Sequence, residues 1–169
     1  KDLYNPFLCK KGVEKIISND FCFDNNGKIF ILTGANKGGK TVFLYSIGIM
    51  YVHLMLGLLL PCRQAEISVI KGVYINTASK QNDYSVRSRF EDECKKLGEY
   101  SKMLNSDSIF LYDEPLSGTS SLEAEEILVG LLASYSKKGF KGVVATHIHS
   151  VARDILKEAR ETANDVSRE

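Results

Sequence analysis

The residues best suited to chemistry lie in a glycine-rich segment between positions 34 and 41, which reads GANKGGKT. It matches the pattern G-x-x-x-x-G-K-[ST], in which the glycines let backbone N–H groups turn toward the phosphates of a nucleotide. The lysine of this pattern reaches the β- and γ-phosphates, and its last residue supplies a hydroxyl ligand for Mg²⁺. We therefore expect a nucleoside triphosphate to bind here, the alternative being a chance glycine-rich turn. The expected contacts are Gly34, Ala35, Asn36, Lys37, Gly38, Gly39, Lys40 and Thr41, with Thr41 also a metal ligand.

Two carboxylates follow a second apolar segment, which runs from Ile109 to Tyr112. In a phosphate-loop ATPase the second metal-binding element belongs here. Asp113 would hold Mg²⁺ in its outer shell, and Glu114 would orient and polarise the attacking water. Both are expected at the C-terminal end of a strand, where open α/β sheets bind ligands. The alternative is a solvated acidic pair at the end of a strand.

A histidine follows a third apolar segment, Val143 to Thr146. His147 is placed to donate a hydrogen bond to the γ-phosphate and so to sense its presence. The competing interpretation is a structural histidine at the end of a strand. The candidate catalytic residues are therefore Lys40, Glu114 and His147.

These side chains need a scaffold, and the hydrophobic pattern predicts one of alternating strands and helices. Buried strands are expected at 28–33, 108–112 and 142–146, with one or two more between 66 and 76. A long apolar helix is expected after Lys40, ended by Pro61, and amphipathic helices are expected at 89–104 and 122–135. Turns or loops are expected at Asn5-Pro6, 24–27 and 77–88, and a charged helical tail from Ser150. This alternation predicts an α/β fold with a mostly parallel sheet flanked by helices.

Length and composition favour one soluble domain. The chain has 169 residues, 44% of them hydrophobic and 25% charged, which is ordinary for a globular protein. A net charge of +1 gives it no strong attraction to DNA or to an anionic membrane, so any nucleic-acid contact is expected elsewhere. The four cysteines have no C-x-x-C spacing and are expected to be free, buried thiols in a reducing cytosol. Because the chain begins with Lys1, we expect it to be a piece of a longer protein.

One segment raises the alternative of a membrane span. No residue between Thr41 and Leu60 carries a formal charge, and this stretch is long enough to cross a bilayer. A span that starts at Thr41 would, however, place the metal-binding hydroxyl at the membrane surface. A helix buried in the centre of an α/β fold explains the segment better.

Five short motifs follow one another between residues 33 and 147. They are Thr33 to Thr41 (TGANKGGKT), Gly57 to Ala65 around Pro61, Ser88 to Glu93 (SRFEDE), Asp113 to Thr119 (DEPLSGT) and Ala145 to His147 (ATH). They resemble T-G-P-N-M-G-G-K-[ST], G-x-x-V-P-A-x-x-A, S-x-F-x-x-E, D-E-x-x-x-G-T and A-T-H of the ATPase domain of the MutS mismatch-repair family. Asn36 and the paired glycines make the first motif far more specific than the general loop pattern.

The resemblance implies a P-loop NTPase of the ABC-ATPase type that hydrolyses ATP with Mg²⁺ to ADP and phosphate. It also implies a homodimer in which each nucleotide lies between the phosphate loop of one subunit and the signature segment of the other. The signature segment here is the one that starts at Ser88 and corresponds to the signature element of ABC-type ATPases. Ser88 would then approach the γ-phosphate in trans, although a helix-capping serine is compatible with the same position.

The same resemblance bears on the whole protein. DNA binding or mismatch repair would be carried by other domains, and the protein would be cytoplasmic, without a membrane partner. Residues 1–169 would form a single ATPase domain from the C-terminal part of a larger protein. This fragment would end soon after His147, the expected sensor of the γ-phosphate.

Departures from the family pattern keep two other functions open. Ala35 and Lys37 replace the usual Pro and Met, Val86 stands where Gly is frequent, and Gln81-Asn82 replaces an acidic pair. Asn5-Pro6 stands where a His-Pro often precedes the adenine pocket, so no adenine contacts are assigned. The altered signature favours a nucleotide-gated interaction module that scarcely hydrolyses ATP. The third candidate is an ABC-type transporter ATPase, against which the absence of an L-S-G-G-Q-like sequence ahead of Asp113 argues.

Overall fold

The computed structural model describes residues 1–23, 28–35, 38–77 and 86–155, and for 86–89 it describes the backbone alone. The expected turn at 24–27, most of the expected loop at 77–88 and the tail beyond 155 lie outside these residues. The elements, in chain order, are α1 (Pro6–Lys10), β1 (Ile29–Thr33), α2 (Lys40–Met55), β2 (Gly72–Thr77), α3 (Val86–Met103), β3 (Ser108–Asp113), α4 (Ser121–Lys137) and β4 (Lys141–Thr146). A further helical segment covers 149–155.

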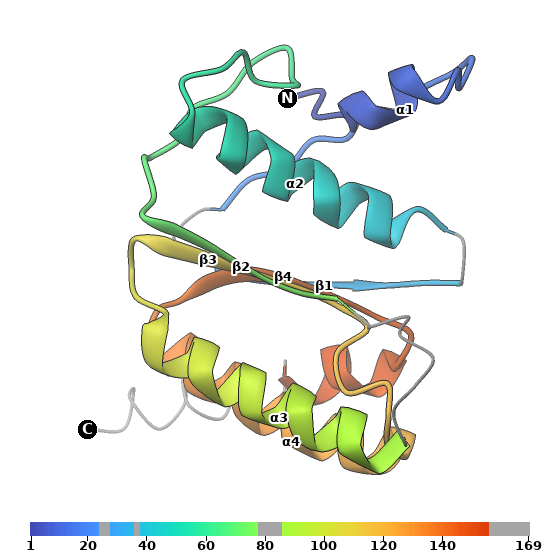
Figure 1. Cartoon of the computed structure of the whole chain (residues 1–169), viewed down its shortest axis with the longest axis vertical. Helices are drawn as coiled ribbons and strands as arrows, with labels where there is room; N and C mark the ends of the chain where they lie inside the picture. The colour runs from blue at the N-terminus through green and yellow to red at the C-terminus, as the bar shows by residue number, and fades with distance from the viewer. Residues whose placement is uncertain (24–27, 36–37, 78–85, 156–169) are drawn as a thin grey trace.

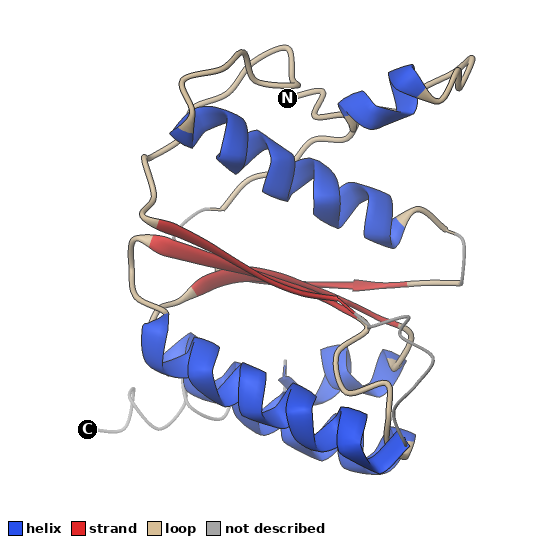
Figure 2. Cartoon of the chain, viewed as in Figure 1, coloured by secondary structure: helices blue, strands red, loops and turns tan. Residues whose placement is uncertain are grey.

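The four strands form one parallel sheet in the order β1-β4-β3-β2. The helices α1 and α2 lie on one side of this sheet, and α3 and α4 lie on the other (Figures 1 and 2). The expectation of an α/β fold with a parallel sheet flanked by helices is therefore confirmed. Because all four strands run the same way, their C-terminal ends meet at one edge, where α/β sheets bind ligands.

The core divides into two hydrophobic clusters, one on each face of the sheet. Every residue of β3 is buried, and its side chains alternate between the two faces. Phe110 and Tyr112 pack with Leu128 and Tyr135 of α4, whereas Leu111 packs in the cluster that contains Leu44 and Ile47 of α2. The strand that carries the acidic pair is thus anchored from both sides.

Helix α2 ends earlier than the sequence indicates. We expected Pro61 to end it, but its last residue is Met55. Gly57 adopts a left-handed conformation with φ of 67°, and the N–H of Leu58 donates to the carbonyl of His53 at 2.8 Å. This is the hydrogen-bonding pattern of a glycine-ended helix, so Gly57 stops the helix before the proline can. None of the helices in the described part of the chain is both long and apolar enough to cross a membrane.

Two smaller expectations differ from the structure, and a third is confirmed. Asn5-Pro6 is the start of helix α1: the Asn5 side chain accepts from the N–H of Phe7, and the proline occupies the first helical position. Of the one or two strands expected between 66 and 76, one forms: β2, which begins at Gly72. The cysteines are free as expected but none is fully buried, since Cys9 and Cys22 are exposed and the other two are partly exposed.

Candidate functional site

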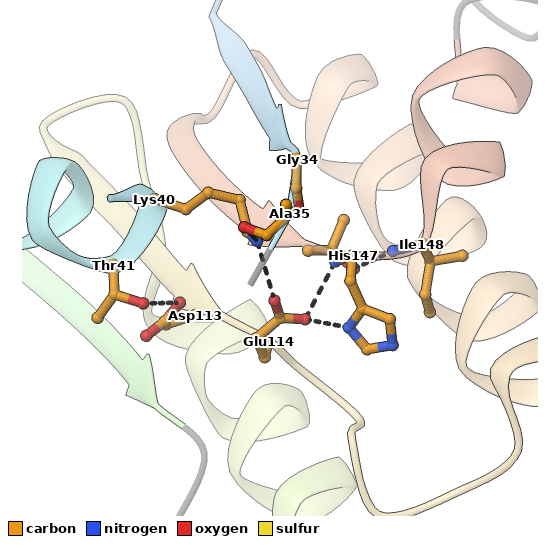
Figure 3. Close-up of polar contacts among 9 residues, drawn as sticks. Gly34, Ala35, Lys40, Thr41, Asp113, Glu114, His147 and Ile148 are labelled. Carbon is orange, nitrogen blue, oxygen red and sulfur yellow. Dashed lines mark hydrogen bonds and ion pairs between the residues drawn. The ribbon is translucent and has the colours of Figure 1, made fainter. Parts of the chain in front are cut away.

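Most of the predicted site residues that the structure describes gather at the C-terminal edge of the sheet (Figure 3). The glycine-rich segment follows β1, Asp113 ends β3 with Glu114 directly after it, and His147 follows β4. Strand β4 lies between the other two, with Ala145 beside Leu32 of β1 and beside Asp113 of β3. The strand order therefore brings three segments together that are far apart in the sequence.

The glycine-rich segment leads into the N-terminus of α2. Gly39 has φ of 85°, a conformation that glycine adopts without strain, and it occupies the position before the first helical residue. No side chain of the described residues caps this helix end. The first N–H groups of a helix have no partner within the helix and carry a partial positive charge. An uncapped helix N-terminus next to a lysine has the chemistry of an anion site.

Lys40 folds back over its own loop. Its Nζ donates to the carbonyl oxygens of Gly34 at 2.8 Å and of Ala35 at 3.2 Å. The same atom lies 3.7 Å from Oε1 of Glu114, and 11% of the lysine side chain is exposed. The cation is therefore held between the loop and the acidic pair.

Thr41 and Asp113 face each other across the edge of the sheet. The threonine hydroxyl donates to Oδ1 of Asp113 at 3.1 Å. Burial raises the pKa of the Asp113 carboxyl, and the charge of Glu114 raises it further, while the hydrogen bond from Thr41 and the charge of Lys40 oppose the rise. A hydroxyl and a buried carboxylate are hard oxygen donors of the type that Mg²⁺ prefers. These two residues thus fit the metal that the sequence predicts.

Glu114 is held by the residues that end β4. Its N–H donates to the carbonyl of Ala145 at 2.8 Å. Its Oε2 accepts from the backbone N–H of His147 at 3.1 Å and contacts Nδ1 of the same residue at 2.6 Å. Because a carboxylate only accepts hydrogen bonds, Nδ1 is the donor in this contact. Glu114 also has φ of 47°, which is uncommon for a residue other than glycine.

A cavity of about 600 Å³ opens beside the loop, and its outer wall was not expected from the sequence. That wall comes from the N-terminal segment, which contributes Asn5, Leu8 and Ile17, while the first turn of α2 contributes Val42 and Phe43. The Asn5 side chain also donates to the carbonyl of Val42 at 3.4 Å. The signal for this wall was the Asn-Pro pair, which favours a capped helix start as much as a turn.

The structure thus brings together five of the predicted polar side chains, those of Lys40, Thr41, Asp113, Glu114 and His147. Gly34, Ala35, Gly38 and Gly39 form the described part of the loop beside them. Asn36 and Lys37 lie outside the described residues. Ser88 lies in the first turn of α3, but its side chain lies outside the described part of the chain.

Comparison with known proteins extends these observations. Residues 30–167 match the family model of MutS domain V. The chain is 30% identical over 139 residues to a DNA mismatch repair protein MutS of Prochlorococcus marinus, an alignment that covers 82% of this chain and 15% of that protein. It is 31% identical over 139 residues to an Endonuclease MutS2 of Thermotoga petrophila, covering 82% and 18% of the two chains. An Endonuclease MutS2 of Listeria innocua is 28% identical over 135 residues, covering 79% and 17%. The chain therefore spans 15–18% of the length of these curated relatives.

Proposed function

The chain belongs to the MutS family, and on this premise we propose that it is an ATPase domain of the P-loop, ABC-like type. It would bind ATP with Mg²⁺ and hydrolyse it to ADP and phosphate. The observation that carries the proposal is the convergence of Lys40, Thr41, Asp113, Glu114 and His147 on one edge of a parallel sheet, next to an uncapped helix N-terminus. Each of these side chains has a task in phosphoryl transfer to water.

The triphosphate would bind at the start of α2. The free N–H groups there and the Lys40 ammonium supply positive charge, and Lys40 would exchange its two loop carbonyl partners for phosphate oxygens. Such preorganised charges stabilise the negative charge that is redistributed in the transition state. Thr41 and Asp113 would hold Mg²⁺, which neutralises phosphate charge when bound.

Hydrolysis would use the Glu114 carboxylate as the proton acceptor. The oxygen of a water molecule bonds to the γ-phosphorus, and the bond from that phosphorus to the β,γ-bridging oxygen breaks. The bridging oxygen leaves with the electron pair on ADP, and a proton of the water passes to Glu114. His147 contacts Glu114, and 54% of its side chain is exposed, so it would be accessible to a γ-phosphate that it senses.

The cavity beside the loop would take the nucleoside. Its volume of about 600 Å³ lies within the range of small-molecule sites. Leu8, Ile17 and Val42 offer apolar surface for a base, and the cavity is continuous with the loop at Gly39 and Lys40. The N-terminal segment would therefore belong to the nucleotide site rather than to a separate unit.

We further propose that two copies of the domain complete each other's sites, with Ser88 acting on the nucleotide of the partner. ATP turnover would be coupled to DNA binding or mismatch repair by parts of the protein beyond this domain. The names of the relatives support this coupling, because they are a DNA mismatch repair protein and endonucleases. The competing function is a nucleotide-gated interaction module with little hydrolysis.

The test is steady-state ATP hydrolysis over a wide range of protein concentration, with Glu114→Gln as the blank. Glu126→Gln, at an exposed position on α4, is the matched control for the loss of a carboxylate. Specific activity that rises with concentration supports shared sites. Activity independent of concentration indicates a self-sufficient monomer or a tight dimer, which size-exclusion chromatography separates. Nucleotide binding with activity no greater than the blank refutes hydrolysis by this chain and favours the interaction module.

A further inference from the structure

The last residue of β4 carries a buried hydroxyl that the proposed chemistry does not use. Thr146 is 1% exposed. Its Oγ1 accepts a hydrogen bond from the N–H of Ile148 at 3.1 Å. This bond joins residues on either side of His147 and closes a tight turn around it. A side-chain hydrogen bond, rather than a backbone hydrogen bond of the sheet, therefore connects the turn to the buried end of β4.

The turn has a direct effect on Glu114 because His147 makes both of its contacts to one oxygen. The backbone N–H and the ring Nδ1 of His147 meet Oε2 at 3.1 Å and 2.6 Å. Two donors from one residue reach the same acceptor only when the backbone and the side chain of that residue are both held in place. The Thr146–Ile148 hydrogen bond holds the backbone on the C-terminal side of His147, and the Ala145 carbonyl, which accepts from the N–H of Glu114, holds it on the other side.

The two oxygens of the Glu114 carboxylate consequently differ. Oε2 already accepts two hydrogen bonds, which is the ordinary capacity of a carboxylate oxygen. Oε1 lies 3.7 Å from Nζ of Lys40, within ion-pair range but beyond a hydrogen bond. Among the residues that the structure describes, Oε1 accepts no hydrogen bond, so it retains its accepting capacity there and faces Lys40 at the loop that would hold the triphosphate (Figure 3).

We propose that Thr146 is a positioning residue that acts through His147 on Glu114. Its hydroxyl holds the turn after β4, His147 then holds Oε2, and Oε1 is the oxygen that takes the proton from water. The positioning role of Thr146 depends only on the contacts among Thr146, Ile148, His147 and Glu114. The role of Oε1 rests on the proposed hydrolysis of ATP.

The positioning is tested without turnover, by amide hydrogen exchange of the full chain followed by NMR. Thr146→Val keeps the β-branched shape and removes the hydroxyl, whereas Thr146→Ser keeps the hydroxyl. We expect Thr146→Val to reduce the protection of the His147 amide about tenfold, the effect of losing the hydrogen bonding around it, and Thr146→Ser to retain it. Unchanged protection in Thr146→Val, or equal loss in both variants, overturns the positioning role. A thermal melt of each variant verifies that it is folded.

The role of Oε1 is tested by a double-mutant cycle on ATP hydrolysis. Thr146→Val is expected to lower kcat about tenfold with KM changed less than about twofold, because it displaces the base without touching the phosphate loop. Thr146→Ser is expected to restore kcat. In a Glu114→Gln background, whose residual turnover is measured against a protein-free blank, Thr146→Val should cause no further loss, because the residue acts through that carboxylate.

An equal loss of kcat in both backgrounds, or a rise in KM alone, overturns the action through Glu114. Wild-type hydrolysis no greater than that of Glu114→Gln overturns both the proposed ATPase activity and the role of Oε1. In that case hydrogen exchange still decides whether Thr146 positions His147, so the two failures are distinguishable.

Discussion

The conformation of the glycine before α2 leads to a quantitative prediction about stability. Gly39 has φ of 85°, and a Cβ atom added there would meet no atom of the described residues within 4 Å, its two chain neighbours aside. A substitution by alanine is therefore free of clashes, and its cost comes from the backbone alone. A left-handed conformation costs an L-residue about 1–2 kcal/mol, part of which is offset because alanine also restricts the unfolded chain. We expect Gly39→Ala to destabilise the fold by about 1 kcal/mol.

Gly130, in the middle of α4, is the matched control. A Cβ there also meets nothing within 4 Å, but this residue is helical and does not have a positive φ. Alanine is the better helix former, so Gly130→Ala should stabilise the protein by about 0.5–1 kcal/mol. The same chemical change is thus expected to have opposite signs at the two positions.

Thermal unfolding followed by circular dichroism measures both variants. For a chain of this size 1 kcal/mol corresponds to about 2–4 °C in Tm, so Gly39→Ala should melt about 2–4 °C lower than wild type and Gly130→Ala higher. Urea titration at one temperature provides an independent free energy of unfolding. Equal shifts in the same direction, or a Gly39→Ala protein as stable as wild type, would refute the assignment of a left-handed residue at the start of α2.

Three further predictions concern the polar residues of the site. Glu114→Gln should lower kcat about 10²–10⁴-fold, the usual contribution of a general base, and calorimetric titration should find its ATP affinity retained. Turnover equal to that of wild type would contradict the role of Glu114 as the base. Lys40→Ala should weaken ATP binding in the same titration because it removes the ammonium expected to contact the phosphates, and unchanged affinity would contradict that contact. The pKa of Asp113 is raised by burial, so its ionisation costs stability as pH rises from the unfolded pKa through the folded one. Asp113→Asn without nucleotide should therefore melt above wild type at neutral pH, with a margin that shrinks on acidification, and a margin that grows in acid would contradict this sign.

Much of the fold was predictable because its signals are local. The run from Ile109 to Tyr112 is apolar without interruption, and the strand it predicts is buried on both faces. Helices α3 and α4 repeat their apolar residues at three- and four-residue steps and lie where this periodicity places them. The end of α2 was missed because two stop signals compete in one stretch, and Gly57 acts before Pro61 is reached.

The site was predictable in its residue types but not in its contacts. Spacing within a short segment identified Lys40 and Thr41, and a strand followed by two carboxylates identified Asp113 and Glu114. Nothing in the sequence indicated that both donors of His147 meet one oxygen of Glu114. The wall of the cavity was also missed, because Leu8 and Ile17 are ordinary apolar residues until the N-terminal segment folds against the start of α2.

The sequence by itself determined which segments become strands and helices and which polar residues end them, because periodicity and turn chemistry act between near neighbours along the chain. Only the tertiary structure decided that β4 lies between β1 and β3, and so that His147, which follows β4, lies beside Glu114 at the end of β3. Strand order is set by hydrogen bonds and packing between residues far apart in the chain, which no local pattern records. The contacts of Glu114 Oε2 with the N–H and Nδ1 of His147 follow from that order, since β3 and β4 are neighbours in the sheet.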